Sequence, residues 1–169
     1  MKKAFIADGA KVLGKVSFGE DCSVWYNAVI RADINTVTIG KRTNVQDCSV
    51  VHVSHDADCV IGDNVTVGHS CIIHGCHIGD NTLIGMGTTI LNHAQIGNNC
   101  IVGAGSLVTQ GKSFPDNSLI LGRPARFIRE LTSEEIEATL ANAQDYIDEA
   151  KRHDSHEFPY YKDGQPKFL

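Results

Sequence analysis

Aliphatic residues recur at every sixth position through most of this 169-residue chain. From Val60 onward the sequence divides into units such as VIGDNV, TVGHSC, HIGDNT and IVGAGS, each with an aliphatic residue in its second slot. The residues in that slot are Ile61, Val67, Ile73, Ile78, Ile84, Ile90, Ile96, Val102 and Val108. The same slot extends upstream through Ile6, Val12, Phe18, Val24, Ile30, Ile39 and Val45. A period this short excludes a solenoid of helices and predicts an all-β solenoid, a parallel β-helix with three flat sides.

Each repeat unit is expected to contribute a short strand followed by a corner. The aliphatic slot points inward and stacks on the equivalent residues of neighbouring coils, about 4.8 Å away. Glycine and asparagine at the corners supply backbone freedom, including positive φ. The period breaks at residues 35–38, at the loop Val53–Cys59, and at a one-residue deletion within IIHGC. We therefore assign residues 1–114 to the β-helix.

The chain changes character after Phe114, where the repeat ends. Residues 115–131 are apolar and basic without a period, which indicates a connector. Thr132 and Glu135 have the spacing of a capping box and predict a helix within residues 132–153. Its apolar stripe is expected to pack on the solenoid flank and consists of Ile136, Leu140, Ala143 and Ile147. Residues 154–169 lack a period and are expected to form an irregular tail.

Composition and charge narrow the function classes. The net charge of −5, without a basic stripe, argues against nucleic acid as a partner. No apolar run reaches membrane-spanning length, and the N-terminus lacks the apolar core of a signal peptide, so a cytoplasmic location is the default. The six cysteines lack C-x-x-C spacing and are expected to be thiols. Four of them fill the last slot of a unit, where a small residue packs: Cys22, Cys59, Cys71 and Cys100.

Three histidines interrupt the repeat at positions suited to a metal ion. His52 and His74 both follow an inward slot and are 22 residues apart, which is one 18-residue coil plus the loop, less the deletion. They should stack on successive coils, roughly 5 Å apart, where two imidazoles can share one metal ion. His69 lies around a corner and could meet the pair from a neighbouring subunit of a trimer. Three neutral histidines with an open position are typical of catalytic zinc; the alternative is that they are scattered surface residues.

Longer motifs surround these histidines. RADINTVTIGKRTNVQD, VVHVS and IGDNVTVGHSCIIHGC resemble the γ-class carbonic anhydrases and their bacterial hexapeptide-repeat relatives, and the resemblance extends to about residue 153. It implies a left-handed β-helix and a homotrimer. It also implies a metal ion held by His52 and His74 of one chain and His69 of the next. The implied reaction is hydration of CO2 to bicarbonate by metal-bound hydroxide. Zn²⁺ is the first expectation, and three imidazoles also suit Fe²⁺ or Co²⁺.

The resemblance implies roles for further residues. Arg31 and Asp33 match an inter-subunit ion pair near the site, and a simple trimer contact is the alternative. Gln46 matches the residue that hydrogen-bonds the metal-bound water or bicarbonate. Tyr146 matches a helix tyrosine that reaches this water, with packing of the helix flank as the alternative. Interface support is implied for two residues, Asp47 and Asn44, the latter with an ordinary turn role as the alternative.

This chain also departs from the founding members of that class. Ile34 replaces an acidic residue directly after Asp33, and the loop SHDADC lacks the glutamate that acts there as proton shuttle. Without a positioned acid or base, proton transfer loses about 10²–10⁴-fold. His55, Asp56 and Asp58 are the candidate substitutes, and a low activity is the corresponding expectation.

Four functions remain open from the sequence. The first is a metal-dependent carbonic anhydrase acting on CO2 and bicarbonate. The second is a metal-dependent thioesterase that acts on coenzyme A esters at the same site. The third is a hexapeptide acyltransferase, which would use one histidine as general base rather than three as ligands. The fourth is a catalytically weak metal-binding homologue. Metal content separates the third from the others.

Overall fold

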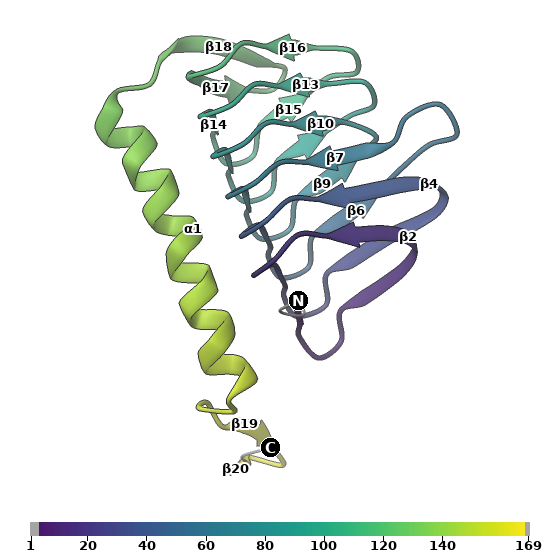
Figure 1. Cartoon of the computed structure of the whole chain (residues 1–169), viewed down its shortest axis with the longest axis vertical. Coiled ribbons are helices and arrows are strands. Elements are labelled where there is room, and N and C mark those ends of the chain that lie inside the picture. Colours follow the sequence, from purple (N-terminus) through teal and green to yellow (C-terminus); the bar gives the residue numbers. More distant parts are fainter. Residues whose placement is uncertain (1–3, 168–169) are drawn as a thin grey trace.

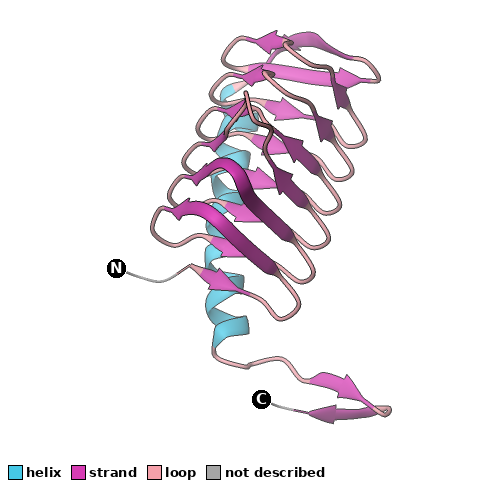
Figure 2. Ribbon diagram, turned by 90° about the vertical axis from the view of Figure 1, so that its right-hand side faces the viewer, coloured by secondary structure: helices cyan, strands magenta, loops and turns pink. Residues whose placement is uncertain are grey.

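The computed structural model describes residues 4–167 and shows a parallel β-solenoid with one long helix along its flank (Figure 1). Residues 1–3 and 168–169, which begin the predicted solenoid and end the predicted tail, lie outside the described residues. Seen from the side, the coils stack as successive flattened turns with the helix running across them (Figure 2). The predicted parallel β-helix with a C-terminal helix is confirmed.

Each coil contributes strands to three sides. The first side contains β1 (Phe5–Ile6), β3 (Ser23–Val24), β5 (Asn44–Val45), β8 (Thr66–Val67), β11 (Leu83–Ile84), β14 (Ile101–Val102) and β17 (Ser118–Gly122). The second side contains β6 (Val50–His52), β9 (Ile72–His74), β12 (Thr89–Ile90) and β15 (Leu107–Val108). The third side contains β7 (Cys59–Ile61), β10 (His77–Ile78), β13 (Gln95–Ile96) and β16 (Ser113–Phe114). Two longer strands bend from the second side onto the third: β2 (Lys11–Phe18) and β4 (Val29–Ile39).

The inward slot of the repeat forms the core. Its residues from Ile61 to Val108 are between 0% and 4% exposed. They stack in register, as in Ile61 against Ile78 and Ile78 against Ile96 on the third side. Ile6 keeps the register with Val24 yet is 48% exposed. Burying each aliphatic side chain stabilises the fold by about 1.5–3 kcal/mol, so every coil of the repeat adds to the stability of the solenoid.

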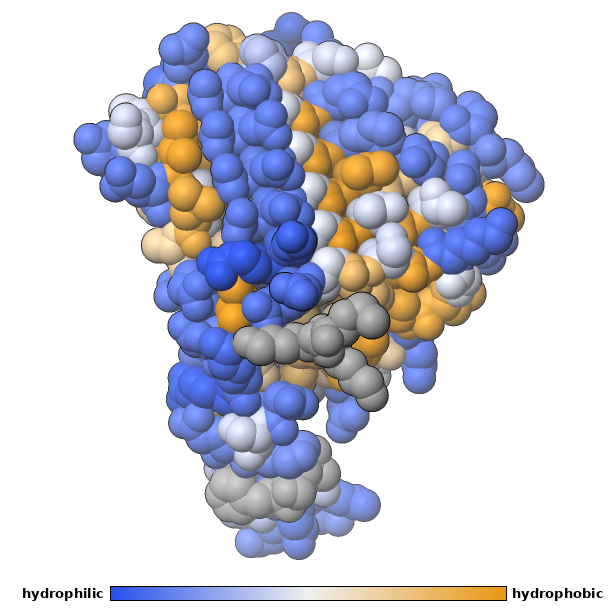
Figure 3. Space-filling view, viewed as in Figure 1, coloured by the Kyte–Doolittle hydropathy of each residue, from blue (hydrophilic) through white to orange (hydrophobic). Residues whose placement is uncertain are grey.

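Polar residues organise the corners of the coils. Asn64, Asn81, Asn99 and Asn117 have φ values of 55°, 56°, 53° and 59°, a left-handed conformation that asparagine tolerates better than most residues. The amides of Asn64, Asn81 and Asn99 each donate to the oxygen of the next asparagine along the stack, at 3.0, 3.0 and 3.1 Å. Hydrophilic residues run as a column along the solenoid beside the helix (Figure 3). We call the four stacked residues Asn64, Asn81, Asn99 and Asn117 the asparagine ladder.

The helix α1 (Ser133–Asp154) begins as the sequence predicts. The Thr132 hydroxyl accepts from the backbone N–H of Glu135, and the Glu135 carboxylate accepts from the backbone N–H of Thr132. The predicted apolar stripe is wrong at Leu140, which is 37% exposed. Ala143 and Ile147 of that stripe are buried, together with Thr139 and Ala150, so the buried line passes through Thr139 in place of Leu140.

Both ends of the C-terminal region contain hairpins where the sequence predicted irregular chain. β17 extends the first side and pairs antiparallel with β18 (Ala125–Glu130) within the expected connector. β19 (Tyr160–Lys162) and β20 (Gln165–Lys167) pair in the expected irregular tail. Asp163 and Gly164 turn between them with φ values of 54° and 73°, and Asp-Gly is a strong hairpin signal.

The cysteines and the helix bear on two expectations from composition, free thiols and no membrane-spanning segment. All six cysteines are free thiols, and Cys48 alone among them is exposed. Within residues 4–167, no helix has the length and apolar character needed to cross a membrane.

Candidate metal centre

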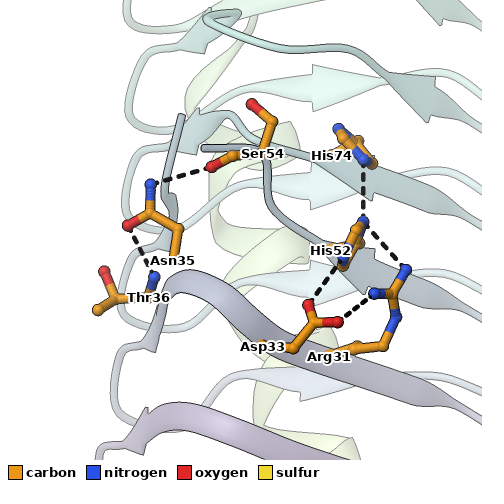
Figure 4. Close-up of polar contacts among 7 residues, drawn as sticks. All are labelled: Arg31, Asp33, Asn35, Thr36, His52, Ser54 and His74. Carbon is orange, nitrogen blue, oxygen red and sulfur yellow. Dashed lines mark hydrogen bonds and ion pairs between the residues drawn. The ribbon is translucent and has the colours of Figure 1, made fainter. Parts of the chain in front are cut away.

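His52 and His74 lie side by side on the second side of the solenoid. They are register partners on β6 and β9, so they occupy the same position in successive coils. Their ring centroids are 5.0 Å apart, which is the spacing expected from the coil repeat. Nδ1 of His52 faces Nε2 of His74 at 3.1 Å (Figure 4). The backbone register therefore brings two imidazole nitrogens to one point.

Arg31 and Asp33 complete a polar cluster around this pair. Arg31 is the register partner of His52 on β4, and its guanidinium lies 3.4 Å from Nδ1 of His52. Asp33 forms an ion pair with Arg31, and its Oδ1 accepts from Nε2 of His52 at 3.2 Å (Figure 4). The hydrogen bond from Arg31 holds the pKa of Asp33 below its ordinary value, and His52 adds to the effect. We call Arg31, Asp33, His52 and His74 the first half-site.

His69 does not join this cluster within the chain. It lies at the corner between the first and second sides, where its Nδ1 contacts Oδ2 of Asp47 at 2.8 Å. A turn at His69 and Ser70, where Ser70 has a φ of 57°, separates His69 from β9, the strand that carries His74. In the described part of this single chain, no three histidine, cysteine or carboxylate side chains gather closely enough to hold a metal ion.

His69 instead lines a hollow of about 200 Å³ between the first side and α1. Gln46 lies there, is 4% exposed, and donates through Nε2 to Oδ1 of Asn44 at 3.1 Å. Asn44 donates in turn to the Thr66 hydroxyl at 2.9 Å, so the Gln46 amide is anchored by a buried network. We call Gln46, Asp47, His69 and Tyr146, which share this corner, the second half-site.

Tyr146 approaches the second half-site from the helix. It lines the hollow and also packs edge-on against Trp25, with ring centroids 5.6 Å apart, which is the packing contact that the sequence left open as the alternative. Burial raises the pKa of the Tyr146 hydroxyl above its ordinary value, and the Asp47 charge acts in the same direction. Asn142, one helical turn earlier, also lines the hollow, and its buried Oδ1 has no hydrogen-bond partner among the described residues. That oxygen can accept a hydrogen bond from a bound molecule.

Sequence reasoning missed the residues that support these side chains. Asn92 accepts from Nδ1 of His74 at 2.5 Å and was not singled out, although it follows His74 by 18 residues, one full coil. Ser54 and Asn142 were missed as well. The coil period could have revealed Asn92, and the helical i, i+4 relation to Tyr146 could have revealed Asn142.

The candidate residues therefore divide between two edges of the second side. The first half-site offers two imidazoles beside a guanidinium–carboxylate pair, and the second offers one imidazole, an amide and a phenol. Between them, on the same side, Val50 and Ile72 are 37% and 46% exposed. The first half-site has two of the histidines that a three-histidine centre needs, and the second half-site has the third.

One family model and several known proteins are similar to this chain. The family model described as bacterial transferase hexapeptide (six repeats) matches residues 75–110. A Methanocaldococcus jannaschii protein named "Probable carbonic anhydrase" is 51% identical over 146 residues, covering 86% of this chain and 92% of that protein. The mitochondrial gamma carbonic anhydrase 1 of Arabidopsis thaliana is 44% identical, over 90% of this chain but 58% of the plant protein. A solved Bacillus cereus protein, provisionally described as an acetyltransferase, has 46% identity and a TM-score of 0.88, over 90% of this chain and 88% of that one.

Proposed function

The chain belongs to the γ-class carbonic anhydrase family, and we propose that it hydrates CO2 to bicarbonate with a divalent metal ion at each interface of a homotrimer. The observation that carries this proposal is the division of the site into two half-sites at opposite edges of the second side. In a threefold assembly the same two edges meet at every interface. His52 and His74 of one copy would then be joined by His69 of the next.

The histidine pair has the geometry that such a metal ion needs. Two nitrogens held about 2.0–2.1 Å from one tetrahedral ion lie roughly 3.4 Å apart. The facing nitrogens of His52 and His74 are 3.1 Å apart, close to that spacing. An imidazole donor set suits Zn²⁺, Fe²⁺ and Co²⁺, and we propose Zn²⁺ as the ion bound. His69 of the neighbouring copy would supply the third imidazole.

The chain's own residues have separable tasks in this reaction. A zinc ion at the centre supplies an acidified water, with a pKa of about 7. Asp33 accepts from His52 and, together with Arg31, holds that ring in place. Gln46, anchored through Asn44, orients the nucleophile or bicarbonate by hydrogen bonding. The Tyr146 ring closes the helix side of the hollow and limits access of bulk water.

Exposed apolar residues support the assembly. Leu13, Val50 and Ile72 are 45%, 37% and 46% exposed, and all three belong to strands of the second side. Met86, at the hollow beside His69, is 59% exposed. Apolar side chains grouped on one face and flanked by polar groups are typical of protein–protein interfaces. Burying this face between copies would complete the metal centre in the same step.

The proton released by hydration needs an acceptor. Asp56 receives hydrogen bonds on both oxygens, from Ser54 at 2.7 Å and from His93 at 3.1 Å. These bonds, that from Ser54 most strongly, lower the pKa of Asp56 and make it a poor proton acceptor near neutral pH. Asp58 is paired with His77 at 2.9 Å. His55, the third candidate, is exposed and can pass the proton to external buffer, so we expect turnover to rise with buffer concentration.

Stopped-flow measurement of CO2 hydration tests this function directly. Protein loaded with zinc, and anaerobically with ferrous iron, should show a metal-dependent rate that is lost in His69→Ala. His77→Ala is the matched control, because His77 lies on the third side and pairs with Asp58. A wild-type protein that binds metal stoichiometrically without any CO2 turnover would contradict the proposal.

A second candidate follows from the Bacillus cereus relative, whose description concerns acetyl transfer. Such an enzyme would need a histidine as general base and no metal ion. Zinc content and turnover of acyl-CoA thioesters distinguish this candidate and the thioesterase from the anhydrase. A metal-free protein that turns over acyl-CoA would favour acyl transfer.

A further inference from the structure

The loop that stands in place of the missing shuttle glutamate is connected to the histidine pair by an unbroken series of hydrogen bonds. Asp56 Oδ1 contacts the Ser54 hydroxyl at 2.7 Å, and the Ser54 hydroxyl contacts Nδ2 of Asn92 at 2.9 Å. Oδ1 of Asn92 then contacts Nδ1 of His74 at 2.5 Å. On the far side, His93 holds the second oxygen of Asp56 at 3.1 Å. The series therefore begins at a carboxylate and ends at a candidate metal ligand.

The Asp56 carboxylate determines which group donates and which accepts in every hydrogen bond of this series. An ionised carboxylate can only accept, so the Ser54 hydroxyl must donate its single proton to Asp56. The Ser54 oxygen then accepts, and the side of Asn92 that faces it must be the NH2 group. The carbonyl oxygen of Asn92 consequently faces His74 and can only accept. His74 must carry its proton on Nδ1, which leaves a lone pair on Nε2 facing His52.

His52 is held in the complementary way. Its Nε2 donates to Asp33, so its Nδ1 carries a lone pair, which faces Nε2 of His74 at 3.1 Å and the Arg31 guanidinium at 3.4 Å. Two lone pairs directed at one point attract a cation. The backbone of the loop is fixed as well, because the Asn35 amide donates to the Ser54 carbonyl at 3.0 Å (Figure 4).

We propose that Asn92, Ser54 and Asp56 are positioning residues that fix the tautomer and orientation of His74, so that Nε2 is available to a metal ion. The proposal rests on the proposed function for the identity of the ligand, but the tautomer itself does not require bound metal. Outer hydrogen-bond partners of this kind fix the ring and raise its basicity. Asp56 thus serves the metal site without carrying the proton.

Replacing Asp56 should reverse the donor and acceptor roles along this series of hydrogen bonds. In Asp56→Ala the Ser54 hydroxyl is free to donate to Asn92, and the Asn92 amide can turn its NH2 group toward Nδ1 of His74. The His74 proton then moves to Nε2. Asn92→Asp keeps an obligatory acceptor next to His74, so the double variant Asp56→Ala/Asn92→Asp should recover the original tautomer. Asp58→Ala is the matched control, because Asp58 belongs to the same loop but pairs with His77.

Two readouts follow this reversal in the full-length protein. Long-range ¹H–¹⁵N NMR of the metal-free protein, with the His74 signals identified by their loss in His74→Ala, reports the tautomer. We expect the Nδ1–H form in wild type, Asp58→Ala and the double variant, and the Nε2–H form in Asp56→Ala. Competition with a chelator reports zinc affinity. We expect about 10–100-fold weaker binding in Asp56→Ala and recovery in the double variant.

The outcomes separate this proposal from the proposed function. An Asp56→Ala protein with the wild-type tautomer and zinc affinity would overturn the positioning role, as would a folded double variant that recovers neither. Circular dichroism confirms that each variant is folded. A wild-type protein that binds no zinc would refute the metal proposal, whereas the tautomer measurement would still decide the role of the series.

Discussion

The asparagine ladder gives the sharpest stability prediction. Asn81 makes two ladder bonds, accepting from Asn64 and donating to Asn99, both at 3.0 Å. Asn81→Ala removes both, which costs about 1–3 kcal/mol in the free energy of unfolding. It also places alanine at a φ of 56°, a left-handed conformation that costs about 1–2 kcal/mol. We therefore expect a total destabilisation of about 2–5 kcal/mol.

Asn117 provides a matched control at the end of the ladder. Its φ is 59°, so the backbone cost of alanine is the same, but it makes one ladder bond, from Asn99 at 3.1 Å. Asn117→Ala should destabilise less than Asn81→Ala, by about 1 kcal/mol. Asn81→Gly removes the same bonds without the backbone strain, so it should destabilise the protein less than Asn81→Ala does.

Equilibrium urea unfolding at one protein concentration measures these differences, because stability of an assembly depends on concentration. The reasoning about the ladder would be refuted by equal losses in Asn81→Ala and Asn117→Ala. Equal losses in Asn81→Ala and Asn81→Gly would refute the assigned backbone cost.

Three further predictions concern charge, catalysis and thiols. Arg129 and the helix cap lower the pKa of Glu135 to about 2, below the ordinary value of about 4.3. The ionised Glu135 side chain therefore stabilises the protein above pH ~4.3, and this stabilisation is lost as the pH falls toward 2. Glu135→Gln should flatten the pH dependence of Tm over that range, and an unchanged profile would contradict the prediction. Gln46→Leu should lower kcat for CO2 hydration about 10²-fold while zinc content stays at the wild-type level, since one preorganised hydrogen-bond donor is removed; a normal kcat would exclude its orienting role. Burial raises the pKa of Cys71 to about 11, so in the native protein a thiol reagent at pH 8 should modify Cys48 at most; rapid modification of Cys48→Ser would show that the buried thiols are accessible.

The sequence is sufficient to predict the features that follow from strict periodicity. The six-residue slot gives the solenoid and its core, because inward residues such as Ile73 and Ile90 must stack in register. The same arithmetic gives the histidine pair, since His52 and His74 occupy equivalent positions in successive coils. The capping box at Thr132 is local and is read directly from four residues.

Other features depend on how side chains orient in three dimensions. The sequence indicates that corner asparagines supply positive φ, but it does not show that their amides connect into a ladder. The apolar pattern of the helix does not show that Thr139 is buried while Leu140 is 37% exposed, because that depends on how the helix is rotated against the first side. The connection from Asp56 to His74 depends on hydroxyl and amide orientations, which no residue pattern encodes.

The most direct test of the shared metal centre mixes two inactive chains. His69→Ala lacks the ligand of the second half-site, and His74→Ala lacks a ligand of the first. Each alone should lose zinc and CO2 turnover. When the two are unfolded together in equal amounts and refolded, about one quarter of the interfaces of a random trimer pair an intact first half-site with an intact His69. We expect zinc content and activity to recover to about that fraction. Zinc retained by either variant alone, or no recovery in a mixture that forms trimers, would contradict a centre shared between chains.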